Sequence, residues 1–197
     1  MSFIIETSAR HVHLDRAAMD VLFGEGAELT NKKDLSQPGQ YACEERVTVV
    51  GPKRERANVT LIGPLRPRVQ VELSATDARE LGIPAPLRDS GDVEGSAGCK
   101  LIGPAGELTI REGVIIAKRH LHLHPDEAAP LHVKDGDRVW VLCRSEARTG
   151  ILGNVLCRVA EDYRAALHID TDEANALGVA GGGFGDIVAL PDTLDTI

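Results

Sequence analysis

The feature that most constrains this chain is an internal duplication. Residues 3–14 read FIIETSARHVHL and residues 114–123 read VIIAKRHLHL, so that a β-branched run leads into Arg-His-x-His-Leu in both. A second pair of segments also matches: residues 72–83 read ELSATDARELGI and residues 168–179 read HIDTDEANALGV. The duplication predicts two similar halves, near residues 1–103 and 104–197, between which strands could be exchanged.

The predicted fold class is mainly β. Most of the chain consists of short β-branched runs bounded by Gly, Pro or charged turns, which is typical of strands. Short helices are expected over residues 15–23, 75–81, 125–131 and 171–177. Many short strands with few helices favour barrels or sandwiches, so that each half would be a β-barrel or β-sandwich domain with short α-helices.

Two segments carry no clear strand or helix pattern. Residues 35–45, LSQPGQYACEE, are expected to form a loop that turns at Pro38-Gly39. Residues 181–197 begin Gly-Gly-Gly-Phe-Gly, and this tail is expected to be loosely ordered.

Composition excludes several classes of partner. A formal charge of −8 argues against nucleic acid, which needs a dense basic surface. No apolar run approaches the roughly 20 residues of a membrane span, and the first residues do not resemble a signal peptide. The four cysteines form no CxxC pair, which is typical of reduced thiols in a cytoplasmic protein.

The paired histidines predict metal binding. Residues i and i+2 of a strand point to the same face, so His11 and His13 present two imidazoles side by side, as do His120 and His122. One such pair is a weak signal, but two copies at matched positions of a repeat are a stronger one.

The second repeated segment adds a third ligand to each pair. Its alignment places Glu72 opposite His168, and both residue types bind metals. The predicted ligand sets are His11, His13 and Glu72 in one half, and His120, His122 and His168 in the other. Three protein ligands with an open position are typical of a catalytic zinc site, although Co²⁺, Ni²⁺ or Fe²⁺ also suit these ligand types.

The neighbouring residues are expected to have other roles. His124 precedes Pro125, where the strand should end, and His132 lies in a turn-like segment, so neither is predicted to be a ligand. Arg10 and Arg119 precede the paired histidines and point to the opposite face, which favours structural roles.

The ligand sets alone leave the chemistry open. The same ligands would serve a metal-dependent hydrolase, or a non-catalytic binding module on a cupin-like barrel. A (β/α)₈ metal-dependent amidohydrolase is excluded, because that fold needs about 250 residues and many helices. No serine-hydrolase or nucleotide-binding motif is present, so a covalent route through Ser36, Ser90 or a cysteine is the less favoured alternative.

Long motifs in a fixed order resemble one known family. RHVHL (10–14), LSQPGQYACEE (35–45), LIGPLR (61–66), RDSGDVEGS (88–96), GVIIAKRHLHL (113–123) and HIDTDEAN (168–175) are similar to those of the phosphate propanoyltransferases. These are the PduL-type phosphotransacylases first associated with propanediol-degrading microcompartments. The resemblance covers the chain to about Gly178, and it departs from the family at His124, where the family usually has an apolar residue.

The resemblance implies a specific site. The family carries two β-barrel domains with two zinc ions between them and usually forms homodimers. Its zinc ligands fall on His11, His13 and Glu72 for one ion and on His120, His122 and His168 for the other, and its phosphate-contacting arginine corresponds to Arg66.

The resemblance also implies a reaction, in which an acyl-CoA and phosphate interconvert with an acyl phosphate and CoA. Propanoyl-CoA and acetyl-CoA are both expected substrates, and the sequence does not distinguish them. We hypothesise that one ion and Arg66 hold the phosphate while the other ion engages the CoA sulfur. Members sent to microcompartments carry an amphipathic N-terminal extension that is not seen here, which favours the cytoplasm.

Overall fold

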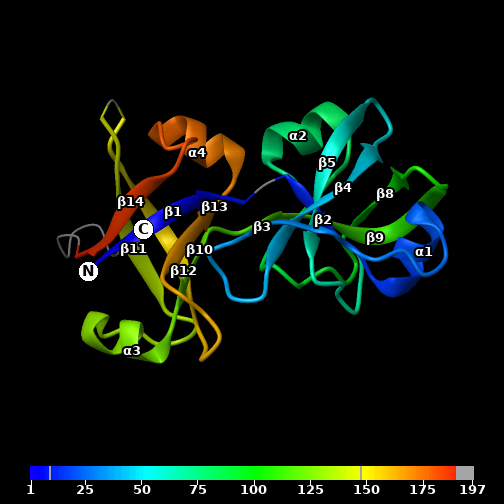
Figure 1. Ribbon diagram of the computed structural model, residues 1–197. Helices are drawn as coiled ribbons and strands as arrows, with labels where there is room; N and C mark the ends of the chain where they lie inside the picture. Colours follow the sequence, from blue (N-terminus) through cyan, green and yellow to red (C-terminus); the bar gives the residue numbers. More distant parts are fainter. Residues whose placement is uncertain (9, 147, 190–197) are drawn as a thin grey trace. The chain divides into compact units, whose positions relative to one another are not determined.

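The chain forms two compact units. The computed structural model describes residues 1–8, 10–146 and 148–189. Contacts divide the chain into Ala9–Ala117, called here the HVH unit after His11–His13, and Met1–Ser8 with Lys118–Ile197, called the HLH unit after His120–His122. Figure 1 shows the strands and short helices of each unit.

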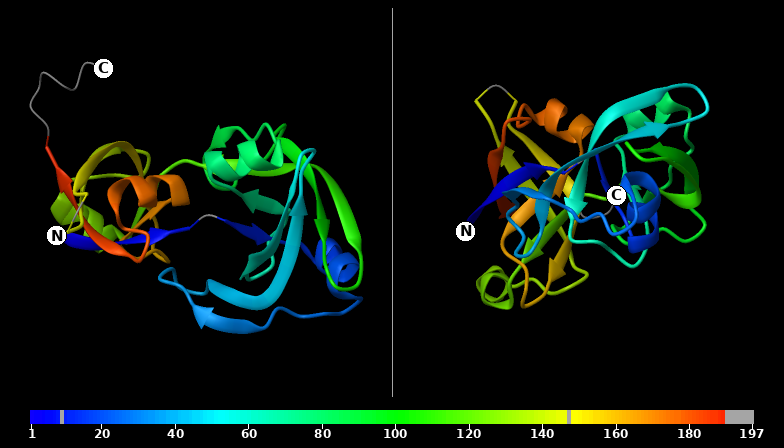
Figure 2. Two further views of the ribbon diagram at one scale, coloured as in Figure 1. Left: turned by 90° about the horizontal axis from the view of Figure 1, so that it is seen from above. Right: turned by 45° about the vertical axis from the view of Figure 1, so that its right-hand side comes forward.

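The HVH unit is a six-stranded barrel. Its ring runs in the order β4 (Tyr41–Val50), β5 (Glu55–Gly63), β2 (His11–His13), β6 (Gln70–Glu72), β9 (Glu107–Ala117) and β8 (Ala97–Ile102). β8 pairs back onto β4 and closes the ring. β3 (Asn31–Asp34) extends it beside β4, and β7 (Leu87–Arg88) beside β9. The antiparallel pair β4 and β5 curves strongly, as Figure 2 shows in light blue and cyan.

The HLH unit is a second closed barrel of six strands. Their order is β1 (Ser2–Thr7), β13 (Ala166–Ile169), β10 (His120–Leu123), β12 (Gly150–Val159), β11 (Arg138–Arg144) and β14 (Gly183–Val188). β10 pairs parallel to β12 and antiparallel to β13, just as β2 pairs parallel to β5 and antiparallel to β6. The two units therefore share one topology, and the predicted fold class of two repeated β-barrels is confirmed.

Each barrel takes one strand from the other sequence repeat. β1 precedes β2 in the chain but pairs with β13 and β14, and β9 precedes β10 but pairs with β6 and β8. The two units therefore do not coincide with a division of the chain near residue 103.

The helices follow their capping signals. α1 (Arg16–Phe23), α2 (Ala75–Leu81) and α4 (Thr171–Leu177) begin after the side-chain caps Asp15, Ser74 and Asp170. α2 and α4 end at Gly82 and Gly178, whose φ angles of 74° and 68° lie in the left-handed region that favours glycine. The fourth predicted helix is α3 (Pro125–Ala128), continued by a 3₁₀ turn, η1 (Ala129–Leu131).

Each barrel has its own aliphatic core. The HVH core includes Val12, Leu61 and Val71, and the HLH core includes Leu121 and Leu167. All five are 0–1% exposed. Val12 and Leu121 are the middle residues of the two His-x-His strands. Because neighbouring residues of a strand point to opposite faces, the flanking histidines point away from these cores.

Two expectations about irregular segments were wrong. Residues 41–45 belong to β4, so the predicted loop ends at Gln40. Gly183–Val188 form β14, which pairs with β1 and β11 and closes a barrel. Its glycines allow close packing rather than disorder, since a Cβ at Gly185 would lie 2.9 Å from both Phe3 and Val141. The rest of the predicted tail, residues 190–197, lies outside the described residues.

Within the described ranges, no helix is long and apolar enough to cross a membrane.

Candidate metal centre

His11, His13 and Glu72 meet on one face of two neighbouring strands. β2 and β6 are antiparallel, with His11 opposite Glu72 and His13 opposite Gln70. Val12 and Val71 lie between them on the core side, so the histidines, Gln70 and Glu72 share the other face. This register brings Glu72 beside the two histidines with which the sequence repeat grouped it.

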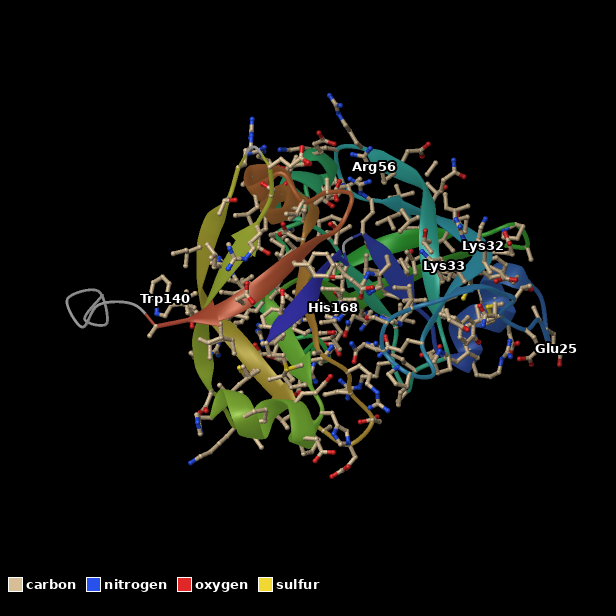
Figure 3. The ribbon with its side chains drawn as sticks, turned by 60° about the vertical axis from the view of Figure 1, so that its left-hand side comes forward. Glu25, Lys32, Lys33, Arg56, Trp140 and His168 are labelled. Carbon is tan, nitrogen blue, oxygen red and sulfur yellow. The ribbon has the colours of Figure 1, made fainter. Side chains whose placement is uncertain are left out.

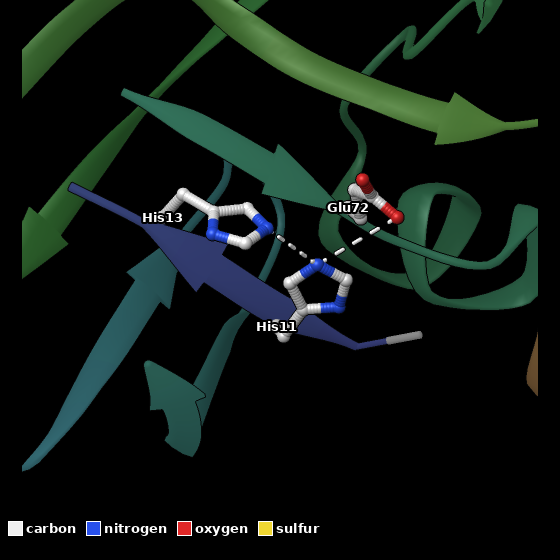
Figure 4. A group of neighbouring side chains, drawn as sticks. All are labelled: His11, His13 and Glu72. Atoms are coloured by element: carbon white, nitrogen blue, oxygen red, sulfur yellow. Dashed lines mark hydrogen bonds and ion pairs between the residues drawn. The ribbon is translucent and has the colours of Figure 1, made fainter. Parts of the chain in front are cut away.

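The three side chains converge closely enough to hold a metal ion. The Nε2 atoms of His11 and His13 lie 3.1 Å apart, and Nε2 of His11 lies 3.7 Å from Oε2 of Glu72 (Figure 4). The ligand atoms of the three residues all lie within 4.8 Å of one another, and all three residues are buried. A buried carboxylate is costly without a positive partner, so this group suits a divalent cation.

The ring of His13 is in the form that a metal needs. Its Nδ1 lies 3.0 Å from the carbonyl oxygen of Ile62, which can only accept a hydrogen bond. Nδ1 therefore carries the proton and Nε2 presents its lone pair toward His11. Burial lowers the pKa of His13 well below its usual value, and the nearby charges of His11 and Arg66 lower it further. His13 is therefore neutral at pH 7, as a metal ligand must be.

Glu72 is oriented by a small network on its other oxygen. Oε1 of Glu72 accepts hydrogen bonds from Nε2 of Gln70 at 2.5 Å and from Oγ of Ser90 at 2.7 Å. The backbone N–H of Gly91 donates to Oε1 of Gln70, which fixes the Gln70 amide with its nitrogen toward Glu72. The network holds Oε1, so Oε2 is the oxygen that faces the histidines. Sequence reasoning did not assign Gln70 a role.

We expect Ser90→Ala to weaken metal binding and leave turnover measurable. The change removes one of the two bonds to Oε1 of Glu72, and losing such an outer partner typically costs about 10–100-fold in metal affinity or activity. Metal affinity by chelator competition measures the effect, with Ser145→Ala as the control, because the Ser145 hydroxyl donates to the carbonyl oxygen of Leu177 in the HLH unit. Complete loss of turnover in a metal-saturated Ser90→Ala protein would instead support Ser90 as a nucleophile.

The HLH unit gathers the second set of histidines. His120 lies opposite His168 across the antiparallel strands β10 and β13. The ring centroids of His120, His122 and His168 lie 4.8–5.2 Å apart. Nδ1 of His120 lies 2.8 Å from the carbonyl oxygen of Lys118, so Nε2 carries its lone pair. His168, labelled in Figure 3, lies on β13.

The two clusters carry their carboxylates at different positions. Glu72 on β6 lies beside Ile115 of β9, whereas His168 on β13 lies beside Glu6 of β1. Oε2 of Glu6 lies 3.8 Å from Nε2 of His168. Among the residues that the structure describes, Glu72 is the carboxylate of the HVH cluster and is itself a predicted ligand. In the HLH unit the carboxylate beside the histidines is Glu6, on the neighbouring strand β1.

Arg66 lies close to the HVH cluster. Its backbone N–H donates to the carbonyl oxygen of Leu14 at 2.8 Å, which ties the segment between β5 and β6 to the end of β2. Its guanidinium charge contributes to the lowered pKa of His13. Arg66 is half-buried, and its charge acts on the histidines from nearby.

The remaining histidines have separate places in the fold. His124 caps α3, with Nδ1 accepting from the N–H of Asp126 and Nε2 lying 3.2 Å from Oε2 of Glu161. His132 is exposed and ends η1 with a positive φ of 57°. β10 ends at Leu123, before Pro125, as predicted.

The four cysteines are free and buried. Burial raises the pKa of Cys43, Cys143 and Cys157 to about 11 and that of Cys99 to about 12. A thiol with a pKa of about 11 is only about one part in a thousand thiolate at pH 8, so none is a good nucleophile.

We therefore expect iodoacetamide at pH 8 to leave the folded protein almost unlabelled and to modify all four cysteines in denaturant. Mass spectrometry measures the number of adducts. Rapid labelling of any cysteine in the folded protein would contradict this account of their burial.

Comparisons with known proteins identify one family. The profile of the phosphate propanoyltransferase family matches residues 4–180. A phosphate propanoyltransferase from Thermotoga maritima is 54% identical over 88% of this chain and 82% of its own length. The phosphate propanoyltransferase from Citrobacter rodentium is 51% identical over 92% of this chain and 87% of its own length. The one from Listeria monocytogenes is 46% identical over 93% of this chain and 86% of its own length. By its fold, its repeated histidine strands and these relatives, the chain belongs to the phosphate propanoyltransferase family.

Proposed function

We propose that this protein is a phosphate acyltransferase that interconverts a short-chain acyl-CoA and phosphate with an acyl phosphate and CoA. The observation that carries the proposal is the buried His11, His13 and Glu72 group in a chain of this family. Propanoyl-CoA is the first substrate to test, since the relatives are named for it, and acetyl-CoA is the second.

The proposal assigns one Zn²⁺ to each histidine cluster. His11, His13 and Glu72 would hold one ion, and His120, His122 and His168 would hold the other. Imidazole and carboxylate suit zinc, and three protein ligands leave a position open. A bound ion would supply Lewis-acid stabilisation of the charge that develops on the acyl oxygen or on the departing sulfur.

Arg66 is assigned to phosphate binding. Its planar guanidinium can donate two parallel hydrogen bonds to phosphate oxygens, and its charge already acts at His13. It would therefore place the phosphate beside the HVH cluster. Positioning of this kind removes part of the entropic barrier to a reaction between two bound molecules.

The reaction needs little proton transfer. An oxygen of the phosphate dianion forms a bond to the thioester carbonyl carbon, the carbon–sulfur bond breaks, and CoA leaves as its thiolate. Phosphate is largely ionised near pH 7, and a thiol with a pKa of about 8.5 leaves without an obligatory acid. The poorly nucleophilic cysteines and the engagement of Ser90 with Glu72 both favour direct attack over an acyl-enzyme.

The remaining partners are part of the same proposal. A homodimer and a cytoplasmic location are expected, and a role in propanediol degradation would follow if propanoyl-CoA is the physiological substrate. Size-exclusion chromatography with light scattering measures the oligomeric state.

The proposed product can be tested directly. Propanoyl-CoA and phosphate are incubated with the zinc-loaded protein, and acyl phosphate is trapped with hydroxylamine as the hydroxamate. Hydroxamate should appear only when phosphate is present. Release of free propanoate without hydroxamate would indicate a metal-dependent hydrolase. A zinc-loaded protein that consumes no thioester would indicate a binding module.

A further inference from the structure

An arginine–carboxylate pair occurs at the same place in both repeats. Nε of Arg10 lies 2.8 Å from Oδ2 of Asp77, and Nε of Arg119 lies 2.8 Å from Oε1 of Glu173. Each arginine directly precedes the first histidine of its strand, and each carboxylate lies five residues after the third predicted ligand, Glu72 or His168. The arginine–carboxylate contact is therefore present in both units, although the carboxylate belongs to aspartate in one and to glutamate in the other.

Both carboxylates occupy the third position of a short helix. Asp77 follows the cap Ser74 of α2, and Glu173 follows the cap Asp170 of α4. The backbone N–H groups in the first turn of a helix favour negative charge, which stabilises a carboxylate there. Each helix directly follows the strand of the third ligand, so the carboxylate is rigidly connected to that ligand.

Both oxygens of each carboxylate are engaged. Oδ1 of Asp77, which is only 2% exposed, lies 3.4 Å from Nη2 of Arg56, and its Oδ2 faces Arg10. Arg56 is labelled in Figure 3. Oε2 of Glu173 accepts from the N–H of Asp170 at 3.1 Å, and its Oε1 faces Arg119. Because one oxygen of each carboxylate has a second partner, the other oxygen offers a fixed position to Arg10 or Arg119.

The strands that these arginines precede are very short. β2 has three residues and β10 has four. The register between each His-x-His strand and its neighbour is therefore set by few backbone hydrogen bonds. A charged contact beside the first histidine adds a second connection between the segment that carries two ligands and the segment that carries the third.

We propose that Arg10 with Asp77, and Arg119 with Glu173, are positioning pairs that hold the His-x-His strand of each unit in place against the strand of its third metal ligand. The inference rests on the proposed function, since it assumes that the two clusters bind metal. These residues act through the ligands and are not catalytic residues themselves.

The test uses zinc release from the full-length protein. Asp77→Asn and Glu173→Gln keep the shape of each side chain and remove its charge. The zinc-loaded proteins are mixed with a chromogenic chelator well below their melting temperatures. Each variant should release one of its two zinc ions about tenfold faster than the unchanged protein does, which is the lower end of the effect of losing a direct partner of a metal ligand. The double variant should release both faster.

Matched controls separate positioning from general stability. Asp186→Asn removes a charge from the Arg144–Asp186 pair, which has the same Nε to Oδ2 distance of 2.8 Å, and Glu107→Gln removes one from a pair with Lys100 in the HVH unit. Val49→Ala removes two methyl groups from the HVH core and lowers stability without changing a residue of either cluster. All three controls should release zinc at the unchanged rate.

The visible absorption of a bound metal ion reports on the geometry of its ligands and does not depend on the stability of the fold. With Co²⁺ in place of zinc, Asp77→Asn and Glu173→Gln should alter the visible absorption of the bound ion, and the controls should not. If a carboxylate variant fails to fold, Arg10→Gln and Arg119→Gln replace it, since both arginine side chains are 34% exposed.

The outcomes distinguish the two proposals. Two zinc ions per chain, with release rates and cobalt spectra that match the controls, would overturn the positioning role and leave the proposed function standing. An unchanged protein that binds no zinc would overturn both.

Discussion

Replacing His11 with alanine should remove about half of the bound zinc and lower the rate of acyl transfer by about 1000-fold or more. The change deletes one of three side chains that converge within 4.8 Å, and the others cannot replace its ring nitrogen. Loss of one Lewis-acid centre costs several kcal/mol of transition-state stabilisation, and each 1.36 kcal/mol is a factor of ten in rate. Elemental analysis and steady-state kinetics measure the two effects.

The matched control is His132→Ala, because that histidine is exposed and ends a 3₁₀ turn. It should leave zinc content and turnover unchanged. His120→Ala tests the other cluster and should resemble His11→Ala in both measurements. Full zinc content and near-normal kinetics in His11→Ala would rule out the HVH cluster as a metal centre.

Replacing Arg66 with alanine should raise the KM for phosphate or reduce turnover by about two to three orders of magnitude, with zinc content unchanged. Removal of a hydrogen-bond donor from a bound or developing anion typically lowers the reaction rate by about 10²–10³-fold. Arg66→Lys should recover only part of the loss, because an ammonium group lacks the planar fork that binds phosphate at two points.

Arg68→Ala provides the control two residues away. Its side chain is 64% exposed and contacts Glu112 at 3.9 Å, so its removal should not affect phosphate binding. The KM for the acyl-CoA should change little in either variant. Arg66→Ala kinetics equal to those of Arg68→Ala would remove Arg66 from the proposed site.

The residues of the HVH cluster could be predicted because the two repeated segments align its three members with those of the other half. Pairing the second repeated segment aligned Glu72 with His168, and the structure places each of them opposite the first histidine of its unit. The helix limits were also predictable, because side-chain caps and the glycines after Leu81 and Leu177 mark them locally.

The strand exchange was harder to derive from the sequence. Alternating apolar residues indicate that β1 and β9 are strands, but they do not indicate which neighbours the strands pair with. β14 was missed because glycine is usually a sign of weak strands, whereas here Gly185 makes room for Phe3 and Val141.

The supporting residues around the ligands were not recognised either. Asp77 and Glu173 already align in the repeat, but a carboxylate near a helix start is equally well explained as a dipole partner. Gln70 lies two residues before Glu72, and only the register with His13 and the contact with Gly91 reveal its role. Contacts between segments far apart in the sequence decide these assignments.

The rate of CoA release from propanoyl-CoA by the zinc-loaded protein, measured with and without phosphate, tests acyl transfer to phosphate directly. Release should saturate with phosphate, fall to the background rate without it, and be lost after a chelator removes the zinc. Release at the same rate without phosphate would contradict the proposed acyl transfer to phosphate.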